Sequence, residues 1–290
     1  MTHRVEPSLN RRKLRLALRR ARERANLTQQ DVAERVGWSP SKLIRMETGT
    51  VGMSVSDLRA LLTLYEVTDP EQIEDLEQAA QGSKGPSWWS GYHEVITPQF
   101  AQYLGYEGAA DSLRTYHPVV VPGHLQTRAY AEALLAPRDL EESRFRRVVD
   151  LRMERQQRMF NDSGRPACTF VLDEAAIRRQ LGDKRVLEEQ LDHLLCLGHR
   201  PEVSVRVLPF EAGAHYSTLG GFALLGFPDD DDLLYREHAA GSMIGSEDHS
   251  LLDRYQECFQ AITDMALDEP ESADLISRVR QKLGARQQPG

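Results

Sequence analysis

Four neighbouring residues could recognise a polar partner through hydrogen bonds and charge. A short helical pattern runs from Pro40 to about Thr48, with Leu43 and Met46 in its inward positions. The outward positions offer hydroxyl, ammonium and guanidinium donors. The residues of this predicted recognition face are Pro40, Ser41, Lys42 and Arg45.

Local start and stop signals predict the two helices that position this face. Thr28 is a good N-cap for a helix from Gln29 to Val36, and Asp31 places a carboxylate at its positive end. Gly37 tolerates positive φ, and Ser39-Pro40 supplies a second cap with proline at the first helical position. The segment is therefore predicted to be a helix-turn-helix. Its expected inward residues are Val32, Ala33, Val36, Trp38, Leu43 and Met46.

The stretch Leu27–Gly49, LTQQDVAERVGWSPSKLIRMETG, resembles the helix-turn-helix of the Xre/Cro family of repressors at nearly every fixed position. The resemblance implies double-stranded DNA as the partner, with Gln29 on a phosphate and Lys42 on the backbone or a base. The residues implied to face base edges are Pro40, Ser41 and Arg45. Many relatives have a hydrogen-bonding side chain in place of Pro40, which offers only apolar contact, for example to a thymine methyl. Specificity is then expected to depend on the other two.

An arginine-rich helix precedes the motif. Ser8 can cap a helix from Leu9 to about Ala25, with leucines on one face and basic residues crowding the other. The basic face is either a solvated surface or, in part, a contact with the DNA backbone. Arg11 and Arg12 are the residues of this face that we expect above all to contact the backbone.

Two further helices are expected after the motif, at Asp57–Tyr65 and Glu71–Ala80. They complete a mainly α, lambda-repressor-like domain of five helices over residues 1–80, the size that the family fold implies. A small, polar stretch broken by glycine and proline predicts a linker at residues 81–87. A second domain, expected to regulate and dimerise, then covers residues 88–290.

Length and composition set further bounds. At 290 residues with 40% hydrophobic residues, the chain can form two domains with buried cores. The net charge of −8 hides a split, because residues 1–50 carry twelve Lys or Arg against five Asp or Glu and the remainder carries −15. Three widely spaced cysteines predict a reducing environment. Since no apolar run or signal-peptide core is evident, we expect a cytoplasmic protein with no membrane contact.

The second domain mixes strand-like and helical patterns. Its expected strands are Ser112–Val121, Cys168–Leu172, Val203–Phe210, Gly221–Phe227 and Leu233–His238. Its main expected helices are Gln126–Leu135, Leu140–Phe160, Asp173–Leu181, Lys184–Leu197, Asp248–Leu267 and Pro270–Leu283. Three late strands with short connections indicate an α+β domain, with a mixed or antiparallel sheet flanked by helices.

Several different short motifs follow one another along this half. They are Val121–Leu135, Arg152–Gln156, Leu172–Glu174, Gln190-Leu191, Val207–Phe210 and Glu237. In order and spacing they resemble the large C-terminal domain of unknown function behind Xre-type domains in actinobacterial developmental regulators such as the WhiJ group. The resemblance implies a transcriptional regulator, often paired with a small partner protein that works against it in an antitoxin-like arrangement. His124 stands where that family often has an apolar residue.

Six polar residues of the second domain could form a site. Because buried arginines need carboxylate partners, the six are interpreted as a structural ion-pair network between a helix and the sheet. The alternative is a polar pocket for an anionic small molecule. The six residues are Arg152, Arg155, Gln156, Asp173, Glu174 and Arg178.

Metal and catalytic chemistry are weakly indicated. His193, Cys196 and His199 lie at steps of three on one predicted helix and could hold zinc, but no fourth ligand is evident and Cys196 fits a leucine stripe. Asp229–Asp232 could attract a hard cation, although a solvated hairpin turn is favoured. No nucleophile elbow, phosphate loop or dinucleotide fingerprint is found. We therefore expect no metal, no cofactor and no enzymatic activity.

Two hypotheses remain. The first is a sequence-specific DNA-binding transcriptional regulator, a repressor, whose second domain forms a homodimer and receives a signal from a partner protein or ligand. The second is a small-molecule sensor or enzyme-like protein that uses the helix-turn-helix mainly for protein contacts. The basic, fully patterned first domain favours the first hypothesis.

Overall fold

A computed structural model describes residues 7–47, 53–84, 87–108, 110–161, 166–215, 220–227, 230–238, 241–245 and 249–285. The chain divides into two compact units. The first consists of Met1–Gly91 and Leu104–Ala109, and the second of Tyr92–Tyr103 and Ala110–Gly290. The domain boundaries expected at residues 80 and 88 both fall within the main segment of the first unit.

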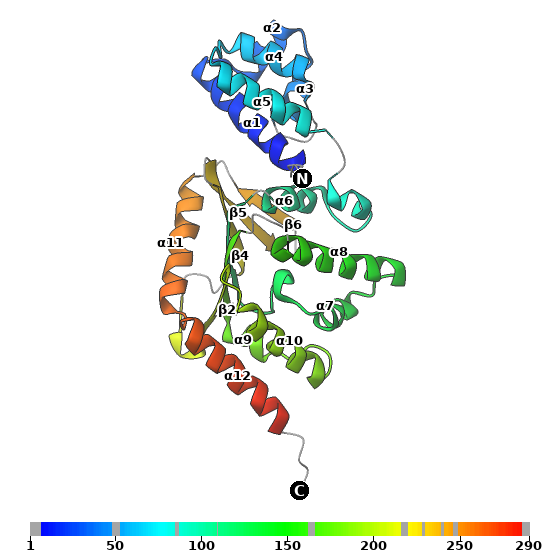
Figure 1. The fold of residues 1–290 in the computed structure, drawn as a ribbon, viewed down its shortest axis with the longest axis vertical. Helices are drawn as coiled ribbons and strands as arrows, with labels where there is room; N and C mark the ends of the chain where they lie inside the picture. The colour runs from blue at the N-terminus through cyan, green and yellow to red at the C-terminus, as the bar shows by residue number, and fades with distance from the viewer. Residues whose placement is uncertain are drawn as a thin grey trace. The chain divides into compact units, whose positions relative to one another are not determined.

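The first unit is helical, and its five predicted helices are present (Figure 1). They are α1 (Pro7–Arg24), α2 (Gln29–Val36), α3 (Pro40–Glu47), α4 (Val55–Leu64) and α5 (Pro70–Gly82). The short 3-10 helix η1 (Trp88–Tyr92) follows. The apolar faces of the five helices pack into one core, because each helix has one apolar stripe to bury. Almost fully buried members of that core include Leu14, Leu18, Val32, Leu43, Leu58 and Leu61.

Three helix ends differ from the sequence prediction. Helix α1 begins at Pro7, so Ser8 lies inside the helix and not at its cap. Helix α4 begins at Val55, and the Ser54 side chain caps it. Helix α5 extends to Gly82, and Ser83 is fully buried with its hydroxyl donating to the carbonyl of Ala80. Tertiary burial therefore orders the first part of the predicted linker.

The second unit contains a six-stranded mixed sheet in the order β3-β2-β1-β4-β5-β6. Its strands are β1 (Ser112–His117), β2 (Ala167–Asp173), β3 (Val203–Leu208), β4 (Phe222–Phe227), β5 (Asp230–His238) and β6 (Gly241–Gly245). Strands β1, β2 and β3 are parallel because helical crossovers join them, whereas β4, β5 and β6 have short connections and are antiparallel. The predicted α+β fold class is confirmed.

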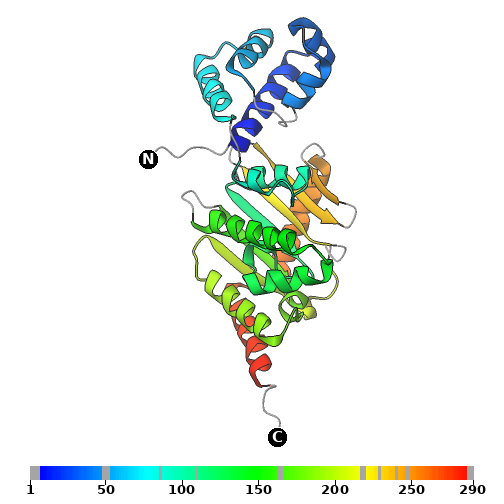
Figure 2. The ribbon, with the colours of Figure 1, turned by 90° about the vertical axis from the view of Figure 1, so that its right-hand side faces the viewer.

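Helices cover both faces of this sheet. Helices α7 (Arg128–Leu135), α8 (Glu142–Asn161) and α10 (Lys184–Leu197) lie on one face, and α11 (His249–Met265) lies on the other (Figures 1 and 2). The remaining helices are α6 (Pro98–Glu107), η2 (Gly123–Leu125), η3 (Ala136–Arg138), α9 (Glu174–Arg178), η4 (Phe210–Ala212) and α12 (Glu269–Ala285). Between the sheet and α11, Tyr116, Leu224, Phe259 and Ile262 belong to one buried cluster.

The sheet has three features that the sequence analysis did not predict. Strand β3 does not neighbour β4, since β2 and β1 lie between them. Strand β6 was not predicted, because a five-residue run bounded by glycines shows no clear alternation. Asp232 is not part of a solvated turn. It lies in β5, where its carboxylate is paired with Arg114 and accepts a hydrogen bond from Gln256 Nε2 at 2.8 Å. Asp229 lies outside the described residues.

Candidate nucleic-acid interface

The helix-turn-helix is shaped by local capping. Thr28 and Asp31 form a reciprocal capping box at the start of α2, and their hydrogen bonds lower the pKa of Asp31. Gly37 ends α2 with φ of 67°, in the left-handed region that favours glycine. Ser39 Oγ accepts from the backbone amide of Lys42 at 3.3 Å at the start of α3. These caps were all predicted, because each depends on residues within one turn of the helix end.

The two helices pack through the predicted inward residues. Val32, Ala33, Leu43 and Met46 are buried in the core of the first unit. Val36 and Trp38 are partly buried and pack against that core. The rest of α3 is thereby held with its opposite face outward.

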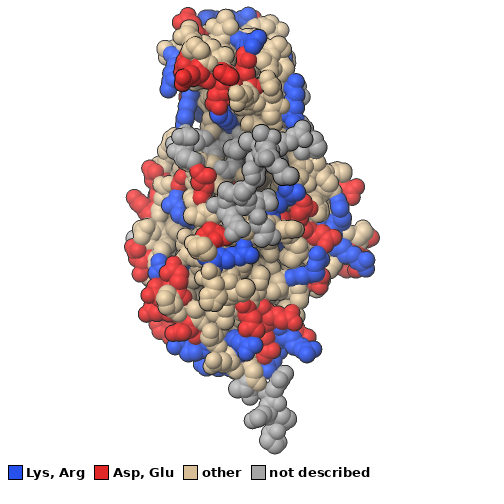
Figure 3. Space-filling model, viewed as in Figure 1, with Lys and Arg blue, Asp and Glu red and all other residues tan. Residues whose placement is uncertain are grey.

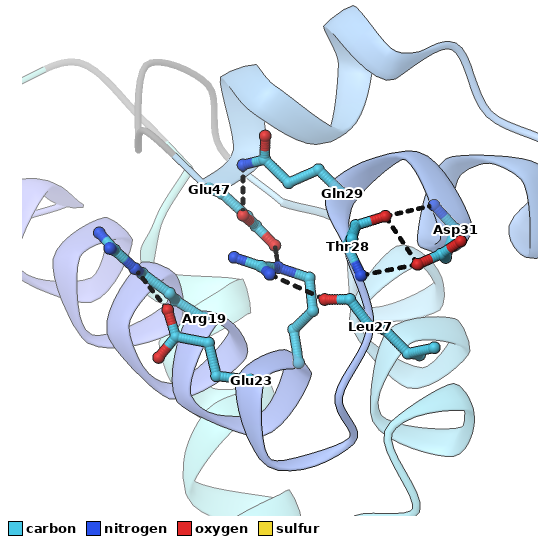
Figure 4. Close-up of polar contacts among 8 residues, drawn as sticks. Arg19, Glu23, Leu27, Thr28, Gln29, Asp31 and Glu47 are labelled. Atoms are coloured by element: carbon cyan, nitrogen blue, oxygen red, sulfur yellow. Dashed lines mark hydrogen bonds and ion pairs between the residues drawn. The ribbon is translucent and has the colours of Figure 1, made fainter.

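A buried carboxylate at the end of α3 ties together α1, α2 and α3. Glu47 accepts from Arg22 Nε at 2.8 Å and from Gln29 Nε2 at 2.6 Å (Figure 4). The same guanidinium donates through Nη1 to the carbonyl of Leu27 at 2.9 Å. The Glu47 side chain is only 4% exposed. Burial, with the negative charge of Glu47 in addition, raises the pKa of the neighbouring Tyr65. We call the Arg22, Glu47 and Gln29 group the Glu47 hub.

The hub uses one of the hydrogen-bond donors that Gln29 could direct to DNA. One hydrogen of its side-chain amide is directed to Glu47. A primary amide has two donor hydrogens, so one remains for a phosphate. Gln29 is half-buried at the start of α2, where the helix dipole also favours an anion. The phosphate contact implied for Gln29 stays a prediction.

Lys42 is engaged within the first unit. Its ammonium lies 2.9 Å from Asp57 Oδ1 of α4 and 3.8 Å from the centroid of the Trp38 ring. Burial alone would raise the pKa of Asp57, but hydrogen bonds from Lys42 and Ser54 outweigh it and lower that pKa. Lys42 therefore joins α3 to α4.

The outward face of α3 contains one residue that the sequence prediction omitted. Pro40 and Ser41 are exposed as expected. Ile44 is 43% exposed on the same face, four residues after Pro40 and three after Ser41. Helical periodicity alone could have placed it there. Arg45 follows on the α3 backbone, and its side chain lies outside the described part of the structure.

Arg11 has a structural contact that the sequence did not predict. Its Nε donates to the carbonyl of Ser83 at 3.0 Å, directly after the C-terminal end of α5. That position suits a cation, because helix carbonyls carry partial negative charge there. The Arg12 side chain lies outside the described residues. The expectation that these two arginines contact the DNA backbone remains untested.

The basic helix does not make the first domain strongly basic. Residues 1–80 carry thirteen Lys or Arg against twelve Asp or Glu, because the segment after residue 50 is acidic. Lys13 of α1 lies 2.5 Å from Asp75 of α5, and Arg59 of α4 pairs with Glu77. Figure 3 shows side chains of both signs on one face of this unit. The excess of positive charge is therefore local to residues 1–50.

The six polar residues expected to cluster in the second unit form two separate groups. In the first, side chains of α8 hold the segment around η2. Gln156 Nε2 donates to the carbonyls of Gly123 and Gln126 at 2.5 and 2.9 Å, and Arg152 Nη1 donates to Gln126 Oε1 at 2.6 Å. Gln190 of α10 is fully buried, donates to the carbonyl of Leu125 and accepts from the amide of Thr127. We call residues 121–127 the clamped segment.

Arg155 lies among aromatic rings beside that segment. Its guanidinium is 5.4 and 5.2 Å from the ring centroids of Phe100 and Tyr103. Tyr103 is buried and stacks on Tyr235 of β5 at 3.9 Å. Burial, with the electrostatic influence of His124 and Arg155 in addition, lowers the pKa of His117 to about 3. His117 is therefore neutral in the folded protein at physiological pH.

The second group lies at the carboxyl end of β2. Asp173 caps α9 by accepting from the amide of Ala175. Glu174 is buried, pairs with Arg178 and accepts from the amide of Phe210 at 2.8 Å. These carboxylates therefore have partners in their own part of the fold. The contacts of the described polar residues fall into two groups, one around η2 and one at the carboxyl end of β2.

The residues weighed for zinc binding also differ from expectation. Cys196 is exposed and does not belong to the apolar stripe of α10. The buried face of α10 also contains Leu197 and the polar Gln190. Leu195 is half-buried. Burial lowers the pKa of His193. Among the described residues no group of His, Cys, Asp and Glu could hold a metal ion. In the same part of the chain no helix is long and apolar enough to cross a membrane.

Comparison with known proteins agrees with this division. Residues 13–76 match a family of helix-turn-helix domains, the class that the geometry of α2 and α3 defines. Residues 100–278, more than half of the chain, match the domain of unknown function DUF5753, and the protein belongs to that family. A comparison with curated proteins found no match, and neither did one with solved structures.

Proposed function

We propose that the protein is a sequence-specific transcriptional repressor of the Xre type that acts in the cytoplasm. The helix-turn-helix domain, which indicates a DNA-binding regulator, supports this proposal. The observation that carries the proposal is the outward face of α3. The start of α3 is fixed by the Gly37 and Ser39 caps, and its end is fixed by the Glu47 hub. Pro40, Ser41 and Ile44 remain exposed. A rigid helix with one exposed face suits insertion into a major groove.

A homodimer is part of the proposal. One recognition helix covers only a few base pairs, so specific binding requires two half-sites about 34 Å apart or a multiple of that spacing. We propose that the second unit joins the two copies and receives a small partner protein or an anionic ligand, in an antitoxin-like arrangement. Such a signal must distinguish two arrangements of the dimer by about 1–3 kcal/mol. The proposal assigns no catalytic step and no cofactor to this unit.

The direct test is selection of bound sites from random duplex DNA with the full-length protein. We expect enrichment of a two-fold symmetric operator. Arg45→Ala should lose a base contact of about 1–3 kcal/mol and relax the preference at one position of each half-site. Gln29→Ala should weaken binding to all sequences alike, because a phosphate contact carries no sequence information.

Arg35→Ala is the matched control, since Arg35 is an exposed arginine of α2 outside the recognition face. It should change the affinity but not the sequence preference. If the full-length protein binds operator and random duplexes equally, the proposed function is wrong. Addition of cell extract to the operator complex then tests the signal, and an unchanged affinity would contradict a receiving role for the second unit.

A further inference from the structure

The side chain of Ile44 on α3 is an exposed aliphatic group. Among the described residues, Ile44 is the one large hydrophobic side chain of the first unit that is exposed to this extent. Burying an exposed aliphatic group against another apolar group lowers the free energy, because apolar surface is removed from water. We propose that Ile44 reads the 5-methyl group of a thymine, so that the targets are operators with a required thymine in each half-site. This inference rests on the proposed function.

The position of Ile44 supports a base contact. Residues at i, i+3 and i+4 share one helix face, so Ile44 lies next to both Ser41 and Pro40. Both of these neighbours are exposed. Pro40 has no amide hydrogen and no polar side-chain atom, and it adds apolar surface beside Ile44. The start of α3 therefore presents an apolar strip with one hydroxyl at its side.

Lys42 does not lie on this strip, because residues two apart on a helix do not share a face. Its ammonium is bound by Asp57 at 2.9 Å and lies 3.8 Å from the centroid of the Trp38 ring. In the major groove the methyl group of thymine is the apolar feature that distinguishes base pairs. An apolar strip on a recognition helix consequently favours thymine over cytosine, adenine and guanine at the base that it faces.

The test begins with the operator selected by the full-length protein. Each thymine is replaced in turn by deoxyuridine, which removes the methyl group and keeps the base pair. With the unaltered protein we expect about fourfold weaker binding at one or two thymines of each half-site, the effect of one buried methyl group. With Ile44→Ala we expect weaker binding to the intact operator and no further loss when those thymines are replaced.

Val119→Ala is the matched control, because Val119 is an aliphatic residue of similar exposure, 49%, in the second unit. Its thymine dependence should equal that of the unaltered protein. If deoxyuridine has no effect, or the same effect in Ile44→Ala, the thymine contact is overturned while the selected operator upholds the proposed function. If no operator is enriched at all, the proposed function itself fails and the inference with it.

Discussion

The two units use polar motif residues in opposite ways. In the helix-turn-helix, Gln29 and Glu47 form the interior hub, while Ser41 and Pro40 of the same motif face outward. In the second unit, Gln156 and Gln190 are directed at backbone groups of their own fold. Polar residue types in a recurring motif therefore do not separate contact residues from supporting residues, and the tertiary structure decides which they are.

The difference has a physical cause. A helix end or an exposed helix face is defined by residues within one or two turns, and its outward side chains are free to meet a partner. The clamped segment, by contrast, is irregular backbone packed between helices. Its buried amides and carbonyls need hydrogen-bond partners, which side chains of α8 and α10 supply.

The largest expected effect concerns the Glu47 hub. Glu47→Ala would leave the guanidinium of Arg22, which is 13% exposed, without its carboxylate, and we expect a loss of about 3 kcal/mol in the free energy of unfolding. Tryptophan fluorescence in urea measures it, because all three tryptophans lie within Met1–Gly91. Glu23→Ala removes the exposed partner of Arg19 and should change little. Equal effects of the two variants would refute a structural hub.

The corresponding change in the second unit is Gln190→Ala. It removes both hydrogen bonds from Gln190 to the clamped segment, and we expect a loss of about 2 kcal/mol in the free energy of unfolding. Far-UV circular dichroism should show this loss while the tryptophan transition stays in place. Glu189→Ala, at an exposed neighbouring position of α10, is the control. An unchanged dichroism transition for Gln190→Ala would mean that the clamp is dispensable.

A pH dependence is expected from His117. Its pKa is about 3 in the fold against 6.5 as the ordinary value, so below pH 6.5 the unfolded chain binds a proton that the folded protein excludes. The contribution of His117 to stability is complete above pH 6.5 and falls by about 1.4 kcal/mol per pH unit down to pH 3. His117→Asn should flatten the unfolding free energy between pH 6.5 and 5, whereas His93→Asn, at an exposed histidine, should not. Identical profiles would contradict the assigned pKa.

The smallest expected effect is that of Lys42→Met. The pair with Asp57 is partly exposed, so its loss should reduce the unfolding free energy by less than about 1 kcal/mol. Because the ammonium is already engaged, the salt dependence of DNA affinity should not change. Arg45→Met, measured in parallel, should alter the sequence preference. A salt slope reduced by about one in Lys42→Met would show instead that Lys42 leaves Asp57 to contact a phosphate.

Local chemistry made much of the fold predictable. Thr28 and Ser39 were both identified as caps, and their side chains accept from the expected helix amides. The buried strand β2 and the helix Lys184–Leu197 were also predicted close to their observed bounds. These features depend on a few consecutive residues, which is why spacing and residue type were sufficient.

Long-range partners were not predictable in the same way. Strand order, the separation of β3 from β4 and the edge strand β6 depend on pairings between distant segments, which periodicity does not encode. The sequence alone established a helix-turn-helix with a defined outward face and an α+β second half. Only the tertiary structure decided that Lys42 binds Asp57 and that Arg152 donates to Gln126. The reason is that a side chain's partner is whatever the fold brings within hydrogen-bond distance, and in both cases that partner comes from another element.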